Sequence, residues 1–201
     1  MKKIKSSYLN NIFFFFIYFI FFFLFLLNRT FSASILEIKQ DDLIIGNLEA
    51  PITVIEYASL SCSHCANFHQ NTLPQIIKEY VDKNKVKIVF RDFPLNYPAL
   101  MGSMILQCID NDVRYEYLSA LFMLQSKWVN PDFEITKKEL LKILQAGGMT
   151  KDQFNQCLDN VDLENKIHVG WRQNYCLSKK YDRLNTPNKM VILISLKILE
   201  F

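Results

Sequence analysis

Hydrophobic and polar positions divide the chain into a leader and a body. Residues 12–27 form an unbroken apolar run of sixteen, preceded by a start with three lysines and followed by small residues at 32–34. This order is typical of a secretory signal peptide, which we place at 1–34 with a cut after Ser34 or Ser32. Because a bilayer requires about 20 apolar residues, an uncleaved membrane anchor is the alternative. In both cases the body is exported to a compartment where disulfides persist.

The first part of the body alternates between strand and helix signals. Residues 51–57 (PITVIEY) are rich in β-branched side chains and predict a buried strand, as do residues 86–90 (VKIVF). Between them, residues 65–80 have apolar positions at helical spacing, and Pro74 predicts a kink in this helix. Strand, helix and strand with short connections predict a βαβ unit with parallel strands and a right-handed crossover.

The strand signal disappears from residue 99 and returns near the C-terminus. Thr136–Glu139 and Thr150–Gln153 read as capping boxes, each of which opens a helix. Apolar residues at helical spacing predict three further helices, at 99–110, 113–128 and 162–180. With the two capped helices, they form a predicted all-helical block of about 80 residues. Thr186-Pro187 ends the block, and the apolar residues that follow have strand character.

Charge is distributed unevenly between leader and body. The net charge is +3, but the first 36 residues hold four basic and no acidic side chains, so the body is close to neutral. A nucleic-acid-binding domain would carry a basic patch in its folded part, and a disordered chain would have fewer apolar residues. Both classes are therefore excluded. The body of about 165 residues is long enough for one domain with a sizeable core.

The strongest chemical signal is the motif Cys62-Ser-His-Cys65, which lies between the first strand and the helix. At a helix start, Cys62 faces unpaired backbone N–H groups and the positive end of the helix dipole, which stabilise its thiolate. A positive charge on His64 stabilises it further and makes the disulfide more oxidising. We therefore expect Cys62 to be the attacking sulfur and Cys65 the partner that closes a redox-active disulfide.

Glu56 lies six residues before Cys62 in an otherwise apolar strand. A buried carboxylate is costly unless it is paired or protonated, so we interpret Glu56 as a proton acceptor beneath the cysteine pair. The alternative is a carboxylate at a strand end that faces solvent. His69 follows Cys65 by four residues and suggests a metal site with the two cysteines and His64. Spacing within one helical turn disfavours four tetrahedral ligands, so we predict no metal.

Three further cysteines, Cys108, Cys157 and Cys176, lie in the helical block. Free cysteines are often simply small buried apolar residues. In an exported protein, pairing becomes more favourable, and we expect a structural disulfide between Cys108 and Cys157, because both lie on apolar helix faces of one compact block. Cys176 is then left over.

These motifs in this order resemble bacterial DsbA-type thiol–disulfide oxidoreductases of the thioredoxin superfamily. The likeness rests on Glu56, the Cys62–Cys65 motif, the segment Phe90–Leu95 (FRDFPL), the helical block and Thr186-Pro187. It implies an α/β fold in which a thioredoxin-like domain is interrupted by an all-helical insertion. The leader at 1–34 is then followed by three parts, namely 35–98 with the βαβ unit, the insertion at 99–181 and the returning domain at 182–201.

The resemblance also implies roles for individual residues. Cys62 matches the nucleophile, Cys65 the buried partner, His64 the modulating histidine, Glu56 the buried acid, and Thr186-Pro187 the substrate-binding pair with a cis-proline. It implies a periplasmic monomer that oxidises unfolded or reduced exported proteins. The Cys62–Cys65 disulfide then serves in place of a cofactor, and a membrane partner of the DsbB type reoxidises it.

The C-terminal end departs from this family. Only 14 residues follow Pro187, so we expect the C-terminal part of the sheet to be missing or altered and one sheet edge to be unfilled. A frameshift near Pro187 that removed the original tail is our explanation. Two other functions therefore stay open besides the oxidase: a disulfide reductase or isomerase, and an inactive truncated thioredoxin-like protein or membrane-anchored binding module.

Overall fold

The computed structural model describes residue 19, residues 37–170 and residues 189–193. The chain forms two compact units, 1–37 and 38–201, and the elements discussed below all belong to the second. Of the leader predicted at 1–34, only Phe19 is among the described residues. Within the described part of the chain, no helix combines the length and the hydropathy needed to cross a membrane.

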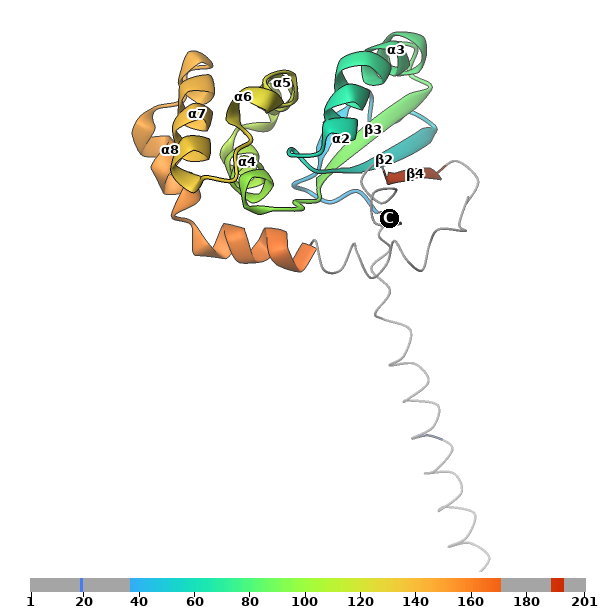
Figure 1. The fold of residues 1–201 in the computed structure, drawn as a ribbon. Helices are drawn as coiled ribbons and strands as arrows, with labels where there is room; N and C mark the ends of the chain where they lie inside the picture. The colour runs from blue at the N-terminus through green and yellow to red at the C-terminus, as the bar shows by residue number, and fades with distance from the viewer. Residues whose placement is uncertain (1–18, 20–36, 171–188, 194–201) are drawn as a thin grey trace, which may run out of the picture. The chain divides into compact units, whose positions relative to one another are not determined.

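The second unit is built on a four-stranded sheet in the order β1-β3-β2-β4 (Figure 1). Its strands are β1 (Leu43–Ile45), β2 (Ile52–Ala58), β3 (Val86–Asp92) and β4 (Lys189–Leu193). The two strands predicted from the sequence, β2 and β3, are parallel neighbours, which confirms the βαβ unit. β1 pairs antiparallel with β3. The central strands β2 and β3 are buried along nearly their whole length, which fits their largely apolar sequences.

The edge of β2 that faces away from β3 is paired with β4. β4 runs parallel to β2, with Thr53 opposite Lys189 and Tyr57 opposite Leu193. The strand character expected for the apolar residues after Pro187 is therefore confirmed at 189–193. The expectation that the C-terminal part of the sheet is missing or altered stays a prediction.

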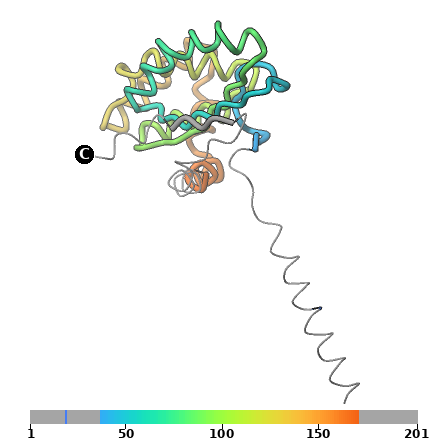
Figure 2. The backbone as a smooth tube through the Cα atoms, turned by 90° about the vertical axis from the view of Figure 1, so that its right-hand side faces the viewer, coloured from blue at the N-terminus to red at the C-terminus, as the bar shows by residue number. Residues whose placement is uncertain are grey.

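The helix after β2 lies over one face of the sheet (Figures 1 and 2). It consists of four consecutive segments, α2 (Ser63–Asn67), η1 (Phe68–Thr72), α3 (Leu73–Ile76) and η2 (Ile77–Val81). The kink predicted at Pro74 takes the form of a wide π-turn before it, in which the Leu73 N–H donates to the Phe68 carbonyl five residues back. Proline has no N–H and its ring crowds the carbonyl four residues earlier, so the helix widens there instead of ending.

The helical block follows β3 and contains no strand among the described residues 97–170. Its helices are α4 (Tyr97–Cys108), α5 (Asn111–Met123), α6 (Gln125–Trp128), α7 (Phe133–Ala146) and α8 (Lys151–Leu158), followed by helical residues 161–170. Figure 1 shows these helices gathered beside the sheet.

The two predicted capping boxes have different outcomes. Thr150 caps α8 as expected, because its Oγ1 accepts from the Gln153 N–H and the Gln153 side chain accepts in return. The capping box at Thr136 was wrong. α7 starts one turn earlier, with Asp132 as its N-cap, and Thr136 is buried and donates its hydroxyl to the Asn130 carbonyl. Similar residue types occur at helix starts and in first turns, so the sequence pattern alone does not separate these positions.

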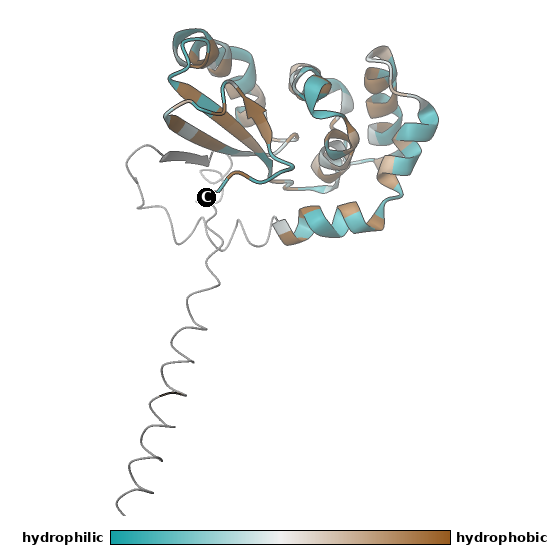
Figure 3. Ribbon diagram, turned by 180° about the vertical axis from the view of Figure 1, so that it is seen from behind, coloured by the Kyte–Doolittle hydropathy of each residue, from teal (hydrophilic) through white to brown (hydrophobic). Residues whose placement is uncertain are grey.

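One hydrophobic core joins the sheet, the cysteine motif and the helical block. Cys65, Phe90, Phe122 and Trp128 all belong to it, and the strands are coloured largely as hydrophobic in Figure 3. α4 approaches the segment before the cysteines closely, since a Cβ at Gly102 would lie 2.7 Å from the Leu60 Cδ1 atom. The helical block therefore forms part of the support under the cysteine motif.

Candidate redox site

The two cysteines of the motif lie at the start of the helix that follows β2. Cys62 is the N-cap of α2, with extended backbone angles, and Cys65 lies inside the helix. A tight turn precedes them, in which the Cys62 N–H donates to the Ser59 carbonyl at 3.0 Å. Both cysteines carry thiols in this structure, and they are 5% and 0% exposed. The helix start thus brings both sulfurs to one place, with Cys62 the outer of the two.

The surroundings of Cys62 favour its thiolate strongly. The largest contribution that lowers the pKa of Cys62 is a hydrogen bond from the Cys65 thiol. Backbone N–H groups of Cys65 and His64 and the charge on His64 lower it further. Together these contributions outweigh the opposing effect of burial, and the pKa of Cys62 falls to about 5. The N–H groups and His64 were expected from the sequence. The leading contribution of the Cys65 thiol was not, because it depends on how the two side chains face each other.

Gln125 is a part of the site that sequence reasoning missed. Its Nε2 atom donates to the Leu60 carbonyl at 2.8 Å and to the Cys62 carbonyl at 3.0 Å. Gln125 is the first residue of α6, so the helical block anchors the backbone that carries Cys62. The sequence holds no signal for this contact, since it links residues more than sixty positions apart through a polar side chain of an ordinary kind.

Glu56 is fully buried in β2, so the alternative of a solvent-facing carboxylate was wrong. Both of its carboxylate oxygens lie 3.1 Å from the Nε2 atom of His69. His69 was considered from the sequence as a metal ligand beside the cysteines. In the structure its side chain instead contacts Glu56, which no pattern along the sequence indicated because the two are 13 positions apart.

Aromatic rings enclose the histidine of this pair. The His69 ring stacks on Phe122 with centroids 4.1 Å apart, and it meets Phe68 and Phe90 edge-on at 5.9 and 6.0 Å. Phe90 and Phe122 belong to the same core cluster as Cys65. The Glu56–His69 pair and the buried cysteine therefore share one apolar region.

The remaining candidate residues fall into two groups. Cys108 and Cys157 are joined by a disulfide, with their Cα atoms 6.0 Å apart, and it connects the end of α4 to α8. Thr186, Pro187 and Cys176 lie outside the described residues.

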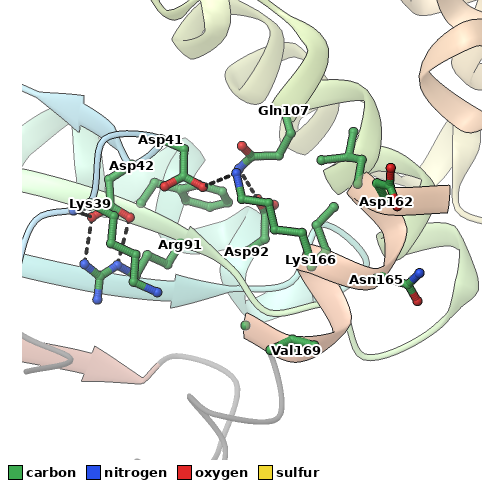
Figure 4. Close-up of a pocket in the computed structure, with 14 residues that line it drawn as sticks. Lys39, Asp41, Asp42, Arg91, Asp92, Gln107, Asp162, Asn165, Lys166 and Val169 are labelled. Carbon is green, nitrogen blue, oxygen red and sulfur yellow. Dashed lines mark hydrogen bonds and ion pairs between the residues drawn. The ribbon is translucent and has the colours of Figure 1, made fainter. Parts of the chain in front are cut away.

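A separate cluster of charges surrounds a cavity of about 450 Å^3 beside β3 (Figure 4). At one side, the Arg91 guanidinium donates to both carboxylate oxygens of Asp42 at 2.9 and 2.7 Å, and this ion pair is almost fully buried. At the other side, Lys166 pairs with Asp41 at 2.8 Å near the surface. These ion pairs connect β3 and helical residues 161–170 to the segment before β1.

Asp92 also lines this cavity and ends β3. It accepts from the Gln107 side chain at 2.8 Å, whereas its Oδ1 atom has no hydrogen-bond partner among the described residues. Burial raises the pKa of Asp92. Together with Arg91 and Phe90, Asp92 belongs to the FRDFPL segment, so part of that motif serves to join the sheet to the helical block.

Comparison with known proteins shows where this arrangement recurs. A family model described as thioredoxin matches residues 39–187. A protein of Rickettsia conorii named as a putative protein-disulfide oxidoreductase is 31% identical over 126 residues, which are 62% of this chain and 44% of that protein. The disulfide bond formation protein D of Bacillus subtilis is 28% identical over 139 residues, 63% of each chain. The match therefore spans less than half the length of the rickettsial relative.

Solved structures agree with the fold. The crystal structure of alpha-DsbA1 from Wolbachia pipientis is 30% identical, with a TM-score of 0.64 over 76% of this chain and 74% of that one. The family model covers most of the chain and includes the cysteine motif, the βαβ unit and the helical block. The chain therefore belongs to the thioredoxin superfamily, as a DsbA-type member.

Proposed function

We propose that this protein is an exported thiol:disulfide oxidoreductase that introduces disulfide bonds into other exported proteins. The observation that carries the proposal is the Cys62 thiol, whose pKa is lowered to about 5 beside the buried Cys65. A stable thiolate stabilises the reduced form relative to the disulfide, and a couple of this kind oxidises its partners.

The reaction begins with the oxidised Cys62–Cys65 disulfide. A substrate thiolate attacks the Cys62 Sγ atom, a mixed disulfide forms, and Cys65 leaves with the electron pair and takes up a proton. A second substrate thiolate then attacks the substrate sulfur of the mixed disulfide and releases Cys62 as a thiolate. The substrate loses two electrons, the Cys62–Cys65 pair gains them, and a membrane partner of the DsbB type reoxidises it.

In this proposal, each residue around the cysteine pair has a separate role. His64 adds positive charge beside the Cys62 thiolate, and Glu56 is the acid that exchanges a proton with Cys65. Thr186 and Pro187 bind the backbone of the substrate. The reacting groups are thus all protein side chains, and the redox-active disulfide serves in place of a cofactor.

The organisation that goes with this function has four parts. Residues 1–34 direct export to the periplasm, as a cleaved signal peptide or an anchor. Residues 35–98 hold the βαβ unit and the cysteines, residues 99–181 the helical insertion, and residues 182–201 the returning part of the thioredoxin-like domain. The protein acts as a monomer on unfolded or reduced chains.

The reduction potential tests this function against a reductase or isomerase. The full chain, purified in detergent, is equilibrated with mixtures of reduced and oxidised glutathione, and its free thiols are counted after alkylation. A potential near that of strong oxidants, about −120 mV, is expected; a value near about −270 mV, typical of thioredoxin, would instead indicate a reductase.

Matched variants locate the activity. Cys62→Ala should abolish oxidative refolding of a reduced protein substrate, and Cys65→Ala should trap mixed disulfides with it. His168→Ala, which alters an exposed histidine in the helical block, is the control and should refold the substrate at the wild-type rate without trapping mixed disulfides. Refolding at the wild-type rate by the Cys62→Ala variant would contradict the assignment of the nucleophile.

A further inference from the structure

The buried carboxylate under the redox site has an ionisable partner. Glu56 and His69 side chains are 1% and 2% exposed, and the His69 Nε2 atom is 3.1 Å from both carboxylate oxygens. If neither group held a proton at this contact, lone pairs would face one another in an apolar interior, which is strongly unfavourable. A hydrogen therefore lies between the two groups, on the nitrogen or on an oxygen.

The wide helical turn before Pro74 begins next to His69. His69 lies one helical turn after Cys65, and Cys65, His69 and Leu73 are all buried on the side of the helix that faces the sheet. The π-turn η1 begins at Phe68, immediately before His69. Isolated π-turns are frequent at functional sites, because they re-aim the side chains around them.

The region around the pair keeps water out. Phe122 covers one face of the His69 ring, and Phe68 and Phe90 meet it edge-on. Cys65 is completely buried in the same cluster as Phe90 and Phe122. When Cys65 leaves as a thiolate in this apolar region, a proton held within the protein is more readily supplied than one from bulk solvent.

We propose that His69 is a positioning residue that keeps Glu56 loaded with the proton that Cys65 exchanges during the redox reaction; this rests on the function proposed above. As the substrate thiolate attacks Cys62, the Cys62–Cys65 bond breaks and Cys65 leaves with the electron pair. The ionisable proton shared by Glu56 and His69 passes from the Glu56 carboxyl to the Cys65 sulfur, and the pair then regains a proton from solvent. On reoxidation the pair releases its proton to solvent and takes up the proton of the Cys65 thiol, so that the complete cycle leaves the pair unchanged.

The variant His69→Gln tests the proposal. Glutamine still donates a hydrogen bond to Glu56 but has no ionisable proton. Reduction of the oxidised full chain by a reduced peptide is followed by rapid acid quenching and alkylation. We expect the reaction of His69→Gln to be at least about 10-fold slower, within the range of general acid–base effects. The pKa of Cys62 should stay near its wild-type value, because His69 does not contribute to it.

A double-mutant comparison separates positioning from simple loss of packing. If the two residues act as one unit, Glu56→Gln and Glu56→Gln/His69→Gln should be equally slow. His168→Gln is the matched control and should react like the wild type. A wild-type rate for His69→Gln would overturn the proposal. If the double variant reacts about tenfold more slowly than Glu56→Gln, the proposal is also overturned. This second comparison does not use the single variant His69→Gln, so it decides the question even if that variant does not fold.

The outcomes also distinguish this proposal from the function on which it rests. If the wild-type chain does not oxidise reduced proteins, or its couple is reducing, the proposed function fails. If the wild type oxidises substrates and His69→Gln does so at the same rate, the function stands and the role of His69 is refuted.

Discussion

At the level of single residues, Cys62 and Cys65 differ in environment although they lie on one helical turn. Cys62 accepts hydrogen bonds from the Cys65 thiol and from backbone N–H groups, whereas Cys65 lies entirely in the core. One sulfur is thus stabilised as an anion, and the other is in a region that disfavours charge. This asymmetry supports the proposal that Cys62 is the cysteine that meets the substrate.

The pKa of Cys62 gives the first prediction. In the reduced protein, the ultraviolet absorbance of the thiolate should titrate with a midpoint at about pH 5. In Cys65→Ala the midpoint should rise toward the ordinary thiol value, because the main hydrogen bond to the thiolate is lost. His168→Ala should titrate like the wild type. An unchanged midpoint in Cys65→Ala would show that the backbone groups and His64 stabilise the anion without the Cys65 thiol.

The same shift makes the stability of the reduced protein depend on pH. Cys62 has a lower pKa in the folded state than in the unfolded chain, so its contribution is complete above the ordinary value of 9.0 and is lost as the pH falls through about 5. The reduced protein should therefore lose stability relative to the oxidised protein between pH 9 and pH 5. Urea unfolding of both forms across this range measures the difference.

Two of the aspartates beside the cavity, Asp41 and Asp42, should respond very differently to removal. Asp42→Ala leaves the buried Arg91 charge without its carboxylate and should reduce the free energy of unfolding by about 3–5 kcal/mol. Asp41→Ala breaks a more exposed pair with Lys166 and should cost less than about 1 kcal/mol. Urea denaturation checks both. Equal losses would mean that the Arg91 charge is accommodated in another way.

Among the elements, helix ends show what neighbouring residues along the chain can specify. The Thr150 box closes locally, and it starts α8, which carries Cys157 to the disulfide with Cys108. The wide turn before Pro74 likewise follows from one residue whose N–H is missing. In contrast, α7 has Asp132 as its N-cap instead of the predicted Thr136, which is buried within the helix.

Thr150 gives a prediction for the start of α8. Thr150→Ala removes the oxygen that accepts from the Gln153 N–H and should lower the free energy of unfolding by about 1 kcal/mol. Thr150→Ser keeps that oxygen and should stay close to the wild type. The measurement is chemical denaturation with the Cys108–Cys157 disulfide intact. An equal loss in both variants would point to the methyl group instead of the cap.

For the protein as a whole, contacts between the helical block and the βαβ unit shape the redox site. Gln125 holds the backbone at Leu60 and Cys62, and Gly102 lets α4 approach Leu60. Phe122 of α5 covers His69. The helical block therefore helps to shape the candidate redox site and also covers part of the core.

The Cys108–Cys157 disulfide gives the prediction that belongs to the whole protein. It closes a loop of 49 positions, so Cys108→Ala/Cys157→Ala should lose about 2–5 kcal/mol of stability. The Cys62 titration should stay near about pH 5, since the disulfide does not contact the motif. Calorimetry and thiolate absorbance test the two parts, with Cys176→Ala as the control. A loss well under about 1 kcal/mol would show that packing alone holds α8 in place.

The sequence by itself determined the features that depend on near neighbours. The order of apolar positions specified β2, the helix after it and β3, and residue chemistry pointed to Cys62 and Cys65 as the candidate redox pair. Pro74 and the Thr150 box acted as expected because their effects extend over only one helical turn. Hydrophobic periodicity and capping are local, so they can be recognised without knowing the rest of the chain.

Only the tertiary structure decided which distant residues meet. His69 as the partner of Glu56, Gln125 as the anchor of Cys62 and β4 as the neighbour of β2 all depend on packing between separate segments. Polar side chains such as these have many potential partners along a sequence. Burial selects one of them, because an unpaired polar group in the core is too costly to keep.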